Sequence, residues 1–245
     1  MLSRDFIIIS HASNVIGLIA PIEEIFSLGK KYGAITLADM AQTAGLIDTN
    51  VGLEIFDFAV FAGHKTLLGP TGISGFVMKP DISLEPVFFG GTGFDSANKD
   101  MPCSLPERYE FGTINILGVS GLNASTKWIL EQGLDVLANI EEAKRLRLIN
   151  LLTSYNYISI IGNVKEQKYV GIVSCLFDGI SSDIAGQLLN KKNISVRTGL
   201  HCAPAAHMFL KTYPAGTIRF SVNCFTTDDD FVALQSALDF FDDNL

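Results

Sequence analysis

The 245 residues suffice for one large domain or two modest ones, each with a buried core. The composition, 48% hydrophobic and 18% charged, excludes a disordered chain. A net charge of −8 opposes nucleic acid or an anionic membrane as partners, and no run approaches the ~20 apolar residues that span a bilayer. The four scattered cysteines include no CxxC pair, which favours free thiols in a reducing cytoplasm.

The first part of the sequence alternates apolar runs with loops and one helical pattern. Apolar runs predict buried strands at 6–10, 34–38, 57–62 and 73–78, and a helical spacing runs from Pro21 to Gly33. This order indicates an α/β sheet buried on both faces. Ligands bind beyond the carboxyl ends of the strands in such sheets. The polar residues found at these ends are Asn14, Asp39, Gln42, His64 and Lys65.

A segment rich in Gly, Ser, Pro and Asn separates this part from the rest of the chain. We interpret residues 90–115 as an extended loop that is functional or covered by a partner. Beyond it, the pattern predicts helices at 116–132, 135–155, 182–191 and from 227, and strands at 170–177, 194–197 and 217–222. We therefore expect a domain change near residue 130, with a large domain over 1–130 and a small one over 131–245.

Three polar residues that follow strands suggest a cofactor site. Lys65, in FAGHKTLLGPTGISG, is a candidate Schiff-base amine, because desolvation beyond a buried strand lowers the pKa of a lysine. Asp39, in AITLADMAQTAG, suits pairing with a pyridine nitrogen, which makes the ring an electron sink, and Gln42 suits a hydrogen bond to a ring oxygen. The alternatives are a surface lysine in a turn, a helix cap at Asp39 and an exposed polar residue at Gln42.

Several motifs together resemble the class V aminotransferase-like enzymes, in which they occur in the same order and at similar spacing. They are HASNVIG, DMAQTAG, GHKTLLGPTG, ERYEFGTIN, RTGLHCAP and TIRFS. They are most similar to the cysteine desulfurase and selenocysteine lyase branch, and the resemblance covers nearly the whole chain. It implies a pyridoxal 5′-phosphate (PLP) enzyme of fold type I, with part of the large domain on a mainly parallel α/β sheet and a small α+β carboxyl-terminal domain.

The resemblance also implies roles for single residues. Lys65 would hold the cofactor covalently and move the substrate α-proton, and Asp39 would pair with the ring nitrogen. The other implied cofactor contacts are Gln42 at the ring oxygen, His64 near the phosphate, and Thr113 at the phosphate of the other subunit of a homodimer. The implied substrate contacts are Asn14, Arg197 and Arg219, of which Arg219 would hold the carboxylate in a bidentate fork.

Cys202 distinguishes the branch within the family. It lies in RTGLHCAP between Arg197 and His201 on one side and His207 on the other, and nearby cations stabilise a thiolate. The resemblance implies that Cys202 takes sulfur from L-cysteine, which leaves L-alanine and an enzyme persulfide. Selenocysteine is a similar substrate, and the sulfur acceptor, a protein or a free thiol, stays open. A buried small hydrophobe and a zinc site with His201 and His207 are the alternatives for Cys202.

Two features depart from the family pattern. Ala62 stands where family members carry a Ser or Thr that binds the cofactor phosphate, a loss of ~1.5–3 kcal/mol. Family members also carry an upstream part with a phosphate-binding loop and an aromatic residue that stacks on the ring. We therefore expect unpaired sheet edges, weak cofactor binding and poor turnover for this chain alone. Another class V aminotransferase-like enzyme and a non-catalytic fragment stay open as alternatives.

Overall fold

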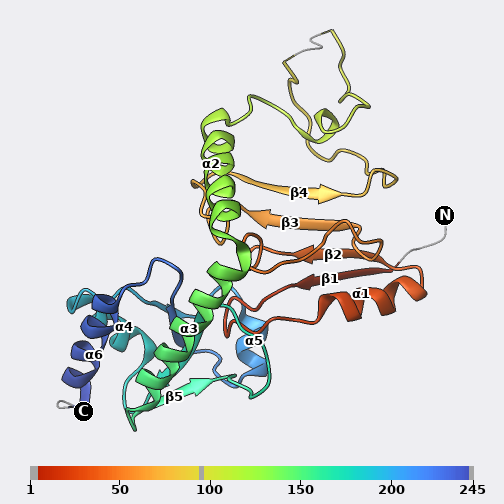
Figure 1. The fold of residues 1–245 in the computed structure, drawn as a ribbon. Coiled ribbons are helices and arrows are strands. Elements are labelled where there is room, and N and C mark those ends of the chain that lie inside the picture. Colours follow the sequence, from red (N-terminus) through yellow and green to blue (C-terminus); the bar gives the residue numbers. More distant parts are fainter. Residues whose placement is uncertain (1–4, 94–96, 243–245) are drawn as a thin grey trace.

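Two sheets and a pair of long helices organise the computed structural model, which describes residues 5–93 and 97–242 (Figure 1). The strands of the first sheet are β1 (Phe6–Ser10), β2 (Ile35–Asp39), β3 (Phe58–Ala62) and β4 (Ser74–Met78). They lie in the order β1-β2-β3-β4, with parallel pairing from β1 to β3 and antiparallel pairing of β4. The predicted α/β class with a mainly parallel sheet is confirmed.

Helix α1 (Ile22–Lys31) packs against this sheet through one apolar face. Ile22 and Phe26 are buried in a cluster with residues of β2 and β3, and burial of such side chains stabilises the fold by roughly 1.5–3 kcal/mol each. A Cβ on Gly29 would lie 2.3 Å from Ile7 Cδ1, so a larger residue there would require the end of the Ile7 side chain to move. This packing fixes the strands whose carboxyl ends carry the predicted site residues.

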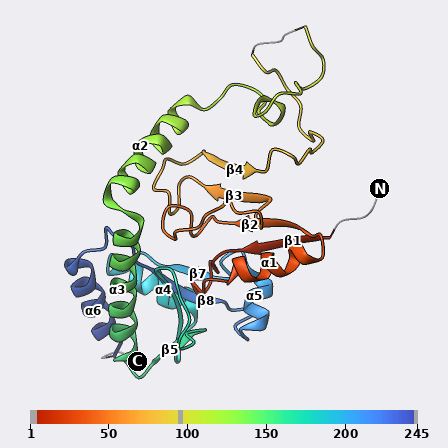
Figure 2. The ribbon, with the colours of Figure 1, turned by 45° about the vertical axis from the view of Figure 1, so that its right-hand side comes forward.

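Helices α2 (Ile116–Gln132) and α3 (Leu134–Thr153) continue one another along one side of the molecule, from the first sheet to the second (Figure 2). They meet at Gly133, whose φ of 86° is a left-handed conformation that glycine adopts without strain. The Asn115 side chain accepts a hydrogen bond from Gly118 N and caps the start of α2.

The second sheet is antiparallel and has helices on one face. Its strands are β5 (Ile158–Ile161), β6 (Ile172–Phe177), β7 (Arg197–Gly199) and β8 (Thr217–Ser221), in the order β5-β6-β8-β7. The helices that follow α3 are α4 (Ser182–Lys191), α5 (Pro204–Phe209) and α6 (Asp228–Asp242). Residues of α3, α4 and α6 share one hydrophobic core with this sheet.

The side chains of β6 alternate between two environments. Val173, Cys175 and Phe177 belong to the core formed with the helices. Ile172 and Ser174 point the other way, because successive side chains of a strand face opposite sides. The second sheet therefore presents one face to its own helices and the other to the amino-terminal half.

The segment that follows β1 joins the two halves, and we call residues 11–20 with 168–174 the seam. Leu18 bridges to Tyr169, Val170 N donates to Gly17 O at 2.9 Å, and Ser174 Oγ donates to Val15 O at 2.5 Å. Gly17 has a φ of 77°, and a Cβ there would lie 2.9 Å from the carbonyl oxygens of Val170 and Ile172. The seam holds the first sheet against the second.

Substitution of Gly17 by Ala is expected to destabilise the protein strongly, because it adds a clash across the seam to an unfavourable φ. Gly33→Ala is the matched control, since Gly33 has a φ of 75° with no atom within 4 Å of the added Cβ. Gly17→Ala should lower the unfolding free energy by about 1–3 kcal/mol more than Gly33→Ala, measured by urea denaturation. Equal losses in the two variants would show that the seam yields to the added methyl group.

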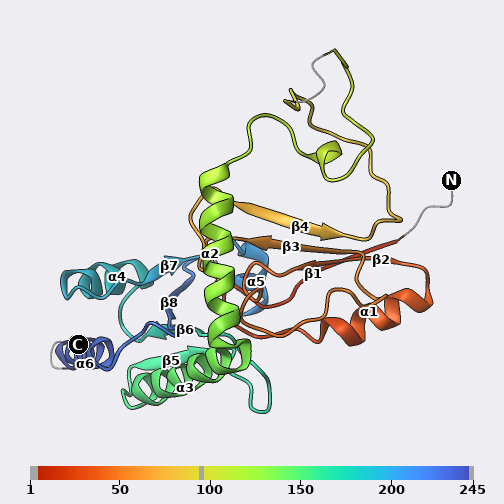
Figure 3. The same ribbon diagram turned by 45° about the horizontal axis from the view of Figure 1, so that its top comes forward.

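The structure differs from the prediction mainly in short elements. The strand expected at 194–197 is wrong in position, because the ladder with β8 begins only at Arg197. Ile194 and Val196 still pack on the core. The alternating apolar residues that suggested a strand are therefore explained by this packing, without strand pairing. The segment from 79 to 115 holds a 3-10 helix, Glu107–Tyr109, and extends beyond the first sheet (Figure 3), while residues 94–96 of the predicted loop lie outside the described residues. Within the described chain, no helix has the length and apolar character needed to cross a lipid bilayer.

Candidate active site

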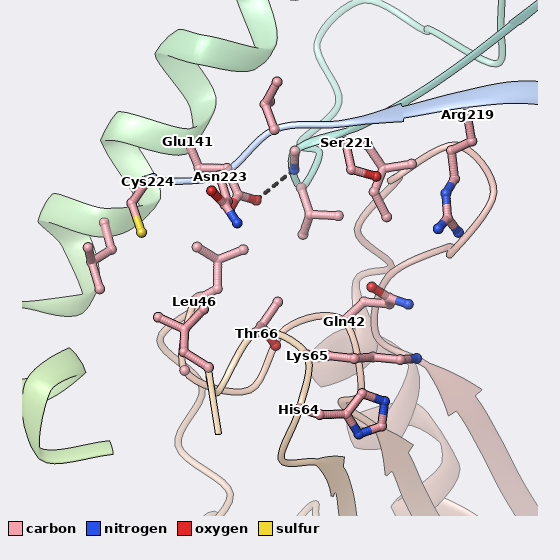
Figure 4. A pocket seen from close by; sticks show the side chains of 17 residues that line it. Gln42, Leu46, His64, Lys65, Thr66, Glu141, Arg219, Ser221, Asn223 and Cys224 are labelled. Carbon is pink, nitrogen blue, oxygen red and sulfur yellow. Dashed lines mark hydrogen bonds between the residues drawn. The ribbon is translucent and has the colours of Figure 1, made fainter. Parts of the chain in front are cut away.

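A pocket of about 300 Å³ lies where the carboxyl ends of β2 and β3 face the second sheet (Figure 4). The first sheet contributes residues of the loops after these strands, and the second contributes the end of β8. The polar residues that line the pocket are Gln42, His64, Lys65, Thr66, Glu141, Arg219, Ser221 and Asn223. Four of the predicted site residues, from three distant parts of the sequence, thus share one pocket.

Lys65 reaches the pocket from a tight loop after β3. Gly63 N donates to Ile73 O at 3.0 Å and Gly69 N donates to Gly63 O at 2.7 Å, so the loop folds back on itself. A Cβ on Gly63 would lie 2.8 Å from Ile73 O, which explains the glycine. The Lys65 side chain is exposed, whereas the sequence predicted a desolvated lysine. Its amine lies on the same side of the pocket as the Gln42 amide and the Arg219 guanidinium (Figure 4).

Asp39 is the last residue of β2 and lies at the same edge of the first sheet, but it does not line the pocket. Its Oδ1 accepts a hydrogen bond from Ala41 N at 2.9 Å, and Ser10 Oγ donates to Oδ2 at 3.4 Å. The first of these contacts is a local turn bond of the kind that the capping alternative predicts. The second oxygen keeps only a long contact, so the carboxylate retains capacity for a further partner.

Arg219 of β8 is held between the two halves of the chain. Its Nη1 donates to Asn14 O at 2.8 Å, and its buried Nε has no hydrogen-bond partner among the described residues. Burial, followed by the charge of Arg197, lowers the pKa of Arg219, while Cys202 acts in the opposite direction. A buried donor without a partner is costly and suits an acceptor from a ligand.

Arg197 and Arg219 lie directly opposite each other in the β7–β8 pair. Like charges in that position destabilise a sheet. Over the part of the chain that the structure describes, neither forms an ion pair with a carboxylate. The two guanidinium groups therefore favour an anion beside them.

Cys202 lies next to Arg197 in a turn that joins β7 to α5. Ala203 N donates to Leu200 O at 2.8 Å, and both central residues have positive φ, 50° at His201 and 62° at Cys202. Turns with two such residues normally carry Asn and Gly, and each left-handed non-glycine residue costs about 1–3 kcal/mol. Arg197 Nη2 donates to the exposed Cys202 Sγ at 3.0 Å. The thiol that the sequence singled out therefore has a cationic partner.

The two histidines near Cys202 are buried and do not supply that charge. Burial, helped by Arg219, lowers the pKa of His201 to about 4, and burial lowers the pKa of His207 as well. His201 Nε2 lies 2.9 Å from Thr217 Oγ1, and His207 Nδ1 lies 2.7 Å from Thr212 Oγ1. Of the three residues that flank Cys202 in the sequence, Arg197 is therefore the one that provides a cation beside the thiol, and the expectation that the histidines add to it is wrong.

The stability of the protein is expected to fall as the pH is lowered from about 6.5 toward 4, in part because of His201. In that range the unfolded chain protonates this imidazole and the folded chain does not, so each such group costs about 1.4 kcal/mol per pH unit. Urea denaturation at several pH values should show a smaller loss for His201→Gln than for the unsubstituted chain. An unchanged pH dependence would mean that His201 is protonated in the folded protein.

Asn14, Arg197, Cys202 and Thr113 do not line the pocket. Asn14 is tied to it, because its Nδ2 donates to His201 O at 2.7 Å and its carbonyl oxygen accepts from Arg219. Thr113 lies exposed in the segment before α2.

Sequence reasoning missed Glu141 of α3, which lines the end of the pocket away from Lys65 (Figure 4). Its Oε1 accepts from Gly171 N at 2.7 Å, and burial raises its pKa. The available signal was its spacing, since Glu141 lies four residues after the buried Leu137 on the same helix face.

The Aminotransferase class-V family model matches residues 3–234, and the chain belongs to this family. It is similar to a probable cysteine desulfurase of Aeropyrum pernix, with 32% identity over 94% of this chain and 58% of that protein. It is also similar to a cysteine desulfurase of Synechococcus elongatus, with 32% identity over 94% of this chain and 36% of that protein.

Solved structures agree with this family. The apo cysteine desulfurase of Thermococcus onnurineus matches with a TM-score of 0.88 and 29% identity, over 98% of this chain and 60% of that one. The Escherichia coli cysteine desulfurase, at 24% identity and a TM-score of 0.85, shows the fold. The chain thus spans less than two thirds of each of these relatives, and the predicted fold type I large domain, present in part, is confirmed.

Proposed function

We propose that this chain removes sulfur from L-cysteine with PLP as cofactor, giving L-alanine and a persulfide on Cys202. The observation that carries the proposal is the contact of Cys202 Sγ with Arg197. Arg197 is paired with Arg219 on the neighbouring strand, and the side chain of Arg219 shares a pocket with Lys65. The amine and a carboxylate-binding group thus share one pocket, and the nucleophile contacts the strand neighbour of that carboxylate-binding group. The named relatives above support this reaction over others of the family.

The residues present fit the cofactor. The Lys65 amine suits its aldehyde and the Asp39 carboxylate suits its ring nitrogen, at the ends of neighbouring parallel strands. Gln42 and His64 line the same pocket for the ring oxygen and the phosphate. The hydroxyl of Thr66 in the pocket wall is buried without a partner in the described chain. When bound, the cofactor supplies an electron sink for charge at the substrate α-carbon.

The site residues then divide the steps of the reaction among them. Arg219 and Asn14 hold the substrate carboxylate, and the Lys65 amine moves the proton of the α-carbon. Arg197 stabilises the thiolate of Cys202, which attacks the substrate sulfur. The S–S bond forms as the carbon–sulfur bond of the substrate breaks, and the electron pair of that bond stays on carbon, which then takes a proton to give L-alanine.

L-selenocysteine offers the same carboxylate and a chalcogen at the same position, and it belongs to the proposed substrate class. The persulfide sulfur would pass to an acceptor protein or to a free thiol. The four free cysteines suit a reducing compartment, the cytoplasm. We also propose that the chain divides near residue 130 into a large PLP-binding domain and a small domain that carries Cys202.

The reaction is tested by supplying the purified chain with excess PLP and L-cysteine. The expected result is an absorbance band of bound cofactor, which borohydride fixes to the protein, and the release of L-alanine. Weak binding and slow turnover are expected, because Ala62 offers no hydroxyl to the phosphate. Bound cofactor without any L-alanine would favour another reaction of the family, and neither signal would favour a non-catalytic role.

A second copy of the chain is proposed to cover an apolar surface formed by the segment before α2 and by its first turn, next to Thr113. This apolar surface comprises Val87, Phe88, Phe89, Phe111, Ile114, Ile116 and Leu117, all exposed. Leu117, 86% exposed, is expected to be central to the dimer. Leu117→Glu should raise the dimer dissociation constant about tenfold or more in sedimentation experiments, while Leu130→Glu, on the same helix outside the surface, should not. Equal effects of both substitutions would place the interface elsewhere.

A further inference from the structure

We infer that His201 is a positioning residue that fixes the turn of Cys202, so that the sulfur lies against Arg197. The inference rests on the proposed function only in treating Cys202 as the reactive thiol. It concerns a side chain that does not line the pocket of Lys65 and Arg219 and that the proposed reaction does not use.

The turn of Cys202 requires an anchor outside its own backbone. Two successive non-glycine residues adopt left-handed φ, and one main-chain bond, from Ala203 N to Leu200 O, closes the turn. A backbone in this conformation persists only where its surroundings over-determine it. Cys202 is exposed, and among the described residues its side chain has one hydrogen bond, from Arg197, so we look to its neighbour for the constraint.

His201 supplies that constraint on two sides. His201 is 2% exposed, and its ring is hydrogen-bonded to the fully buried Thr217, the first residue of β8. Its carbonyl oxygen accepts from Asn14 Nδ2 at 2.7 Å. Thr217 pairs with Gly199 across β7 and β8, so the imidazole ties the turn to the same two strands that carry Arg197 and Arg219.

The surroundings of the His201 ring make the effect geometric rather than electrostatic. The ring of His207 lies 5.3 Å away, centroid to centroid, and bonds in turn to Thr212. Neutral rings add no charge beside the sulfur. His201 therefore influences Cys202 by fixing the backbone, and the guanidinium of Arg197 provides the charge.

Alkylation of the individual cysteines by iodoacetamide at neutral pH, read by peptide mass spectrometry, tests this assignment. The exposed Cys103 gives an internal rate standard, and the fully buried Cys175 stays unlabelled while the chain is folded. His201→Leu is expected to lower the Cys202/Cys103 rate ratio about three- to tenfold, because the thiolate loses its hydrogen bond from Arg197. His201→Gln should largely restore the ratio, since its amide reaches the position of Nε2.

Two further variants make the test independent of the folding of His201→Leu. Thr217→Val removes the hydroxyl without touching the turn and should lower the ratio in the same direction. In an Arg197→Gln chain, already slow, His201→Leu should bring no further decrease. An unchanged ratio in Thr217→Val, or additive losses with Arg197→Gln, would overturn the assignment. The readout needs no cofactor, so a failure of the proposed reaction would leave this result standing.

Discussion

Replacement of Cys202 by Ala is expected to lower L-alanine formation from L-cysteine by at least about 100-fold while cofactor attachment at Lys65 persists. Without the thiolate of Cys202, no group accepts the sulfur of the substrate, so its carbon–sulfur bond stays intact. Lys65 and Asp39 belong to the first sheet and Cys202 to the loop after β7, so the substitution does not touch the residues proposed to hold the cofactor. Chromatographic measurement of L-alanine, beside borohydride trapping of the cofactor, separates the two properties.

Cys103→Ala is the matched control for Cys202→Ala. Cys103 is also exposed, and its substitution should leave L-alanine formation unchanged. A Cys202→Ala chain that kept most of its activity would remove the desulfurase proposal and favour another reaction on the same scaffold.

Replacement of Lys65 by Ala should abolish covalent attachment of the cofactor. The amine is the only group of that chemistry that lines the pocket, among the residues described. After incubation with excess PLP and borohydride, the unsubstituted chain should gain the mass of the reduced cofactor on the Lys65 peptide, and the variant should show only background labelling. L-Alanine formation should fall with it.

Lys127→Ala controls for labelling of surface lysines, because Lys127 is an exposed residue of α2. It should retain the full signal on the Lys65 peptide. Equal incorporation into the Lys65→Ala chain, or a reduced cofactor mapped to another lysine, would refute the assignment of Lys65.

Much of the fold follows from local pattern. The strands from β1 to β4 are five-residue apolar runs bounded by turn residues, and these limits are visible in the sequence. Helix α5 was not predicted, since its six residues are too short for a helical period to show. Strand β5, with four residues, was missed for the same reason.

The candidate site, like the fold, could be predicted from the sequence only in part. The rule that ligands bind beyond strand ends brought Gln42, His64 and Lys65 together, while Arg219 joined them only through the family resemblance. The charge state of His201 was mispredicted, because burial depends on contacts with residues distant in sequence. The left-handed turn at His201 and Cys202 was invisible as well, because it contains neither glycine nor asparagine.

The seam around Gly17 has a consequence for the motions of the protein. The amine of Lys65 and the thiol of Cys202 lie in halves of the chain with separate hydrophobic cores, and the hydrogen bonds between residues 11–20 and 168–174 connect these halves. Local opening of such a contact requires less free energy than global unfolding. We therefore expect amide hydrogen exchange at Val170 to report how often Lys65 and Cys202 move apart while both cores stay intact, a state in which the proposed reaction cannot proceed.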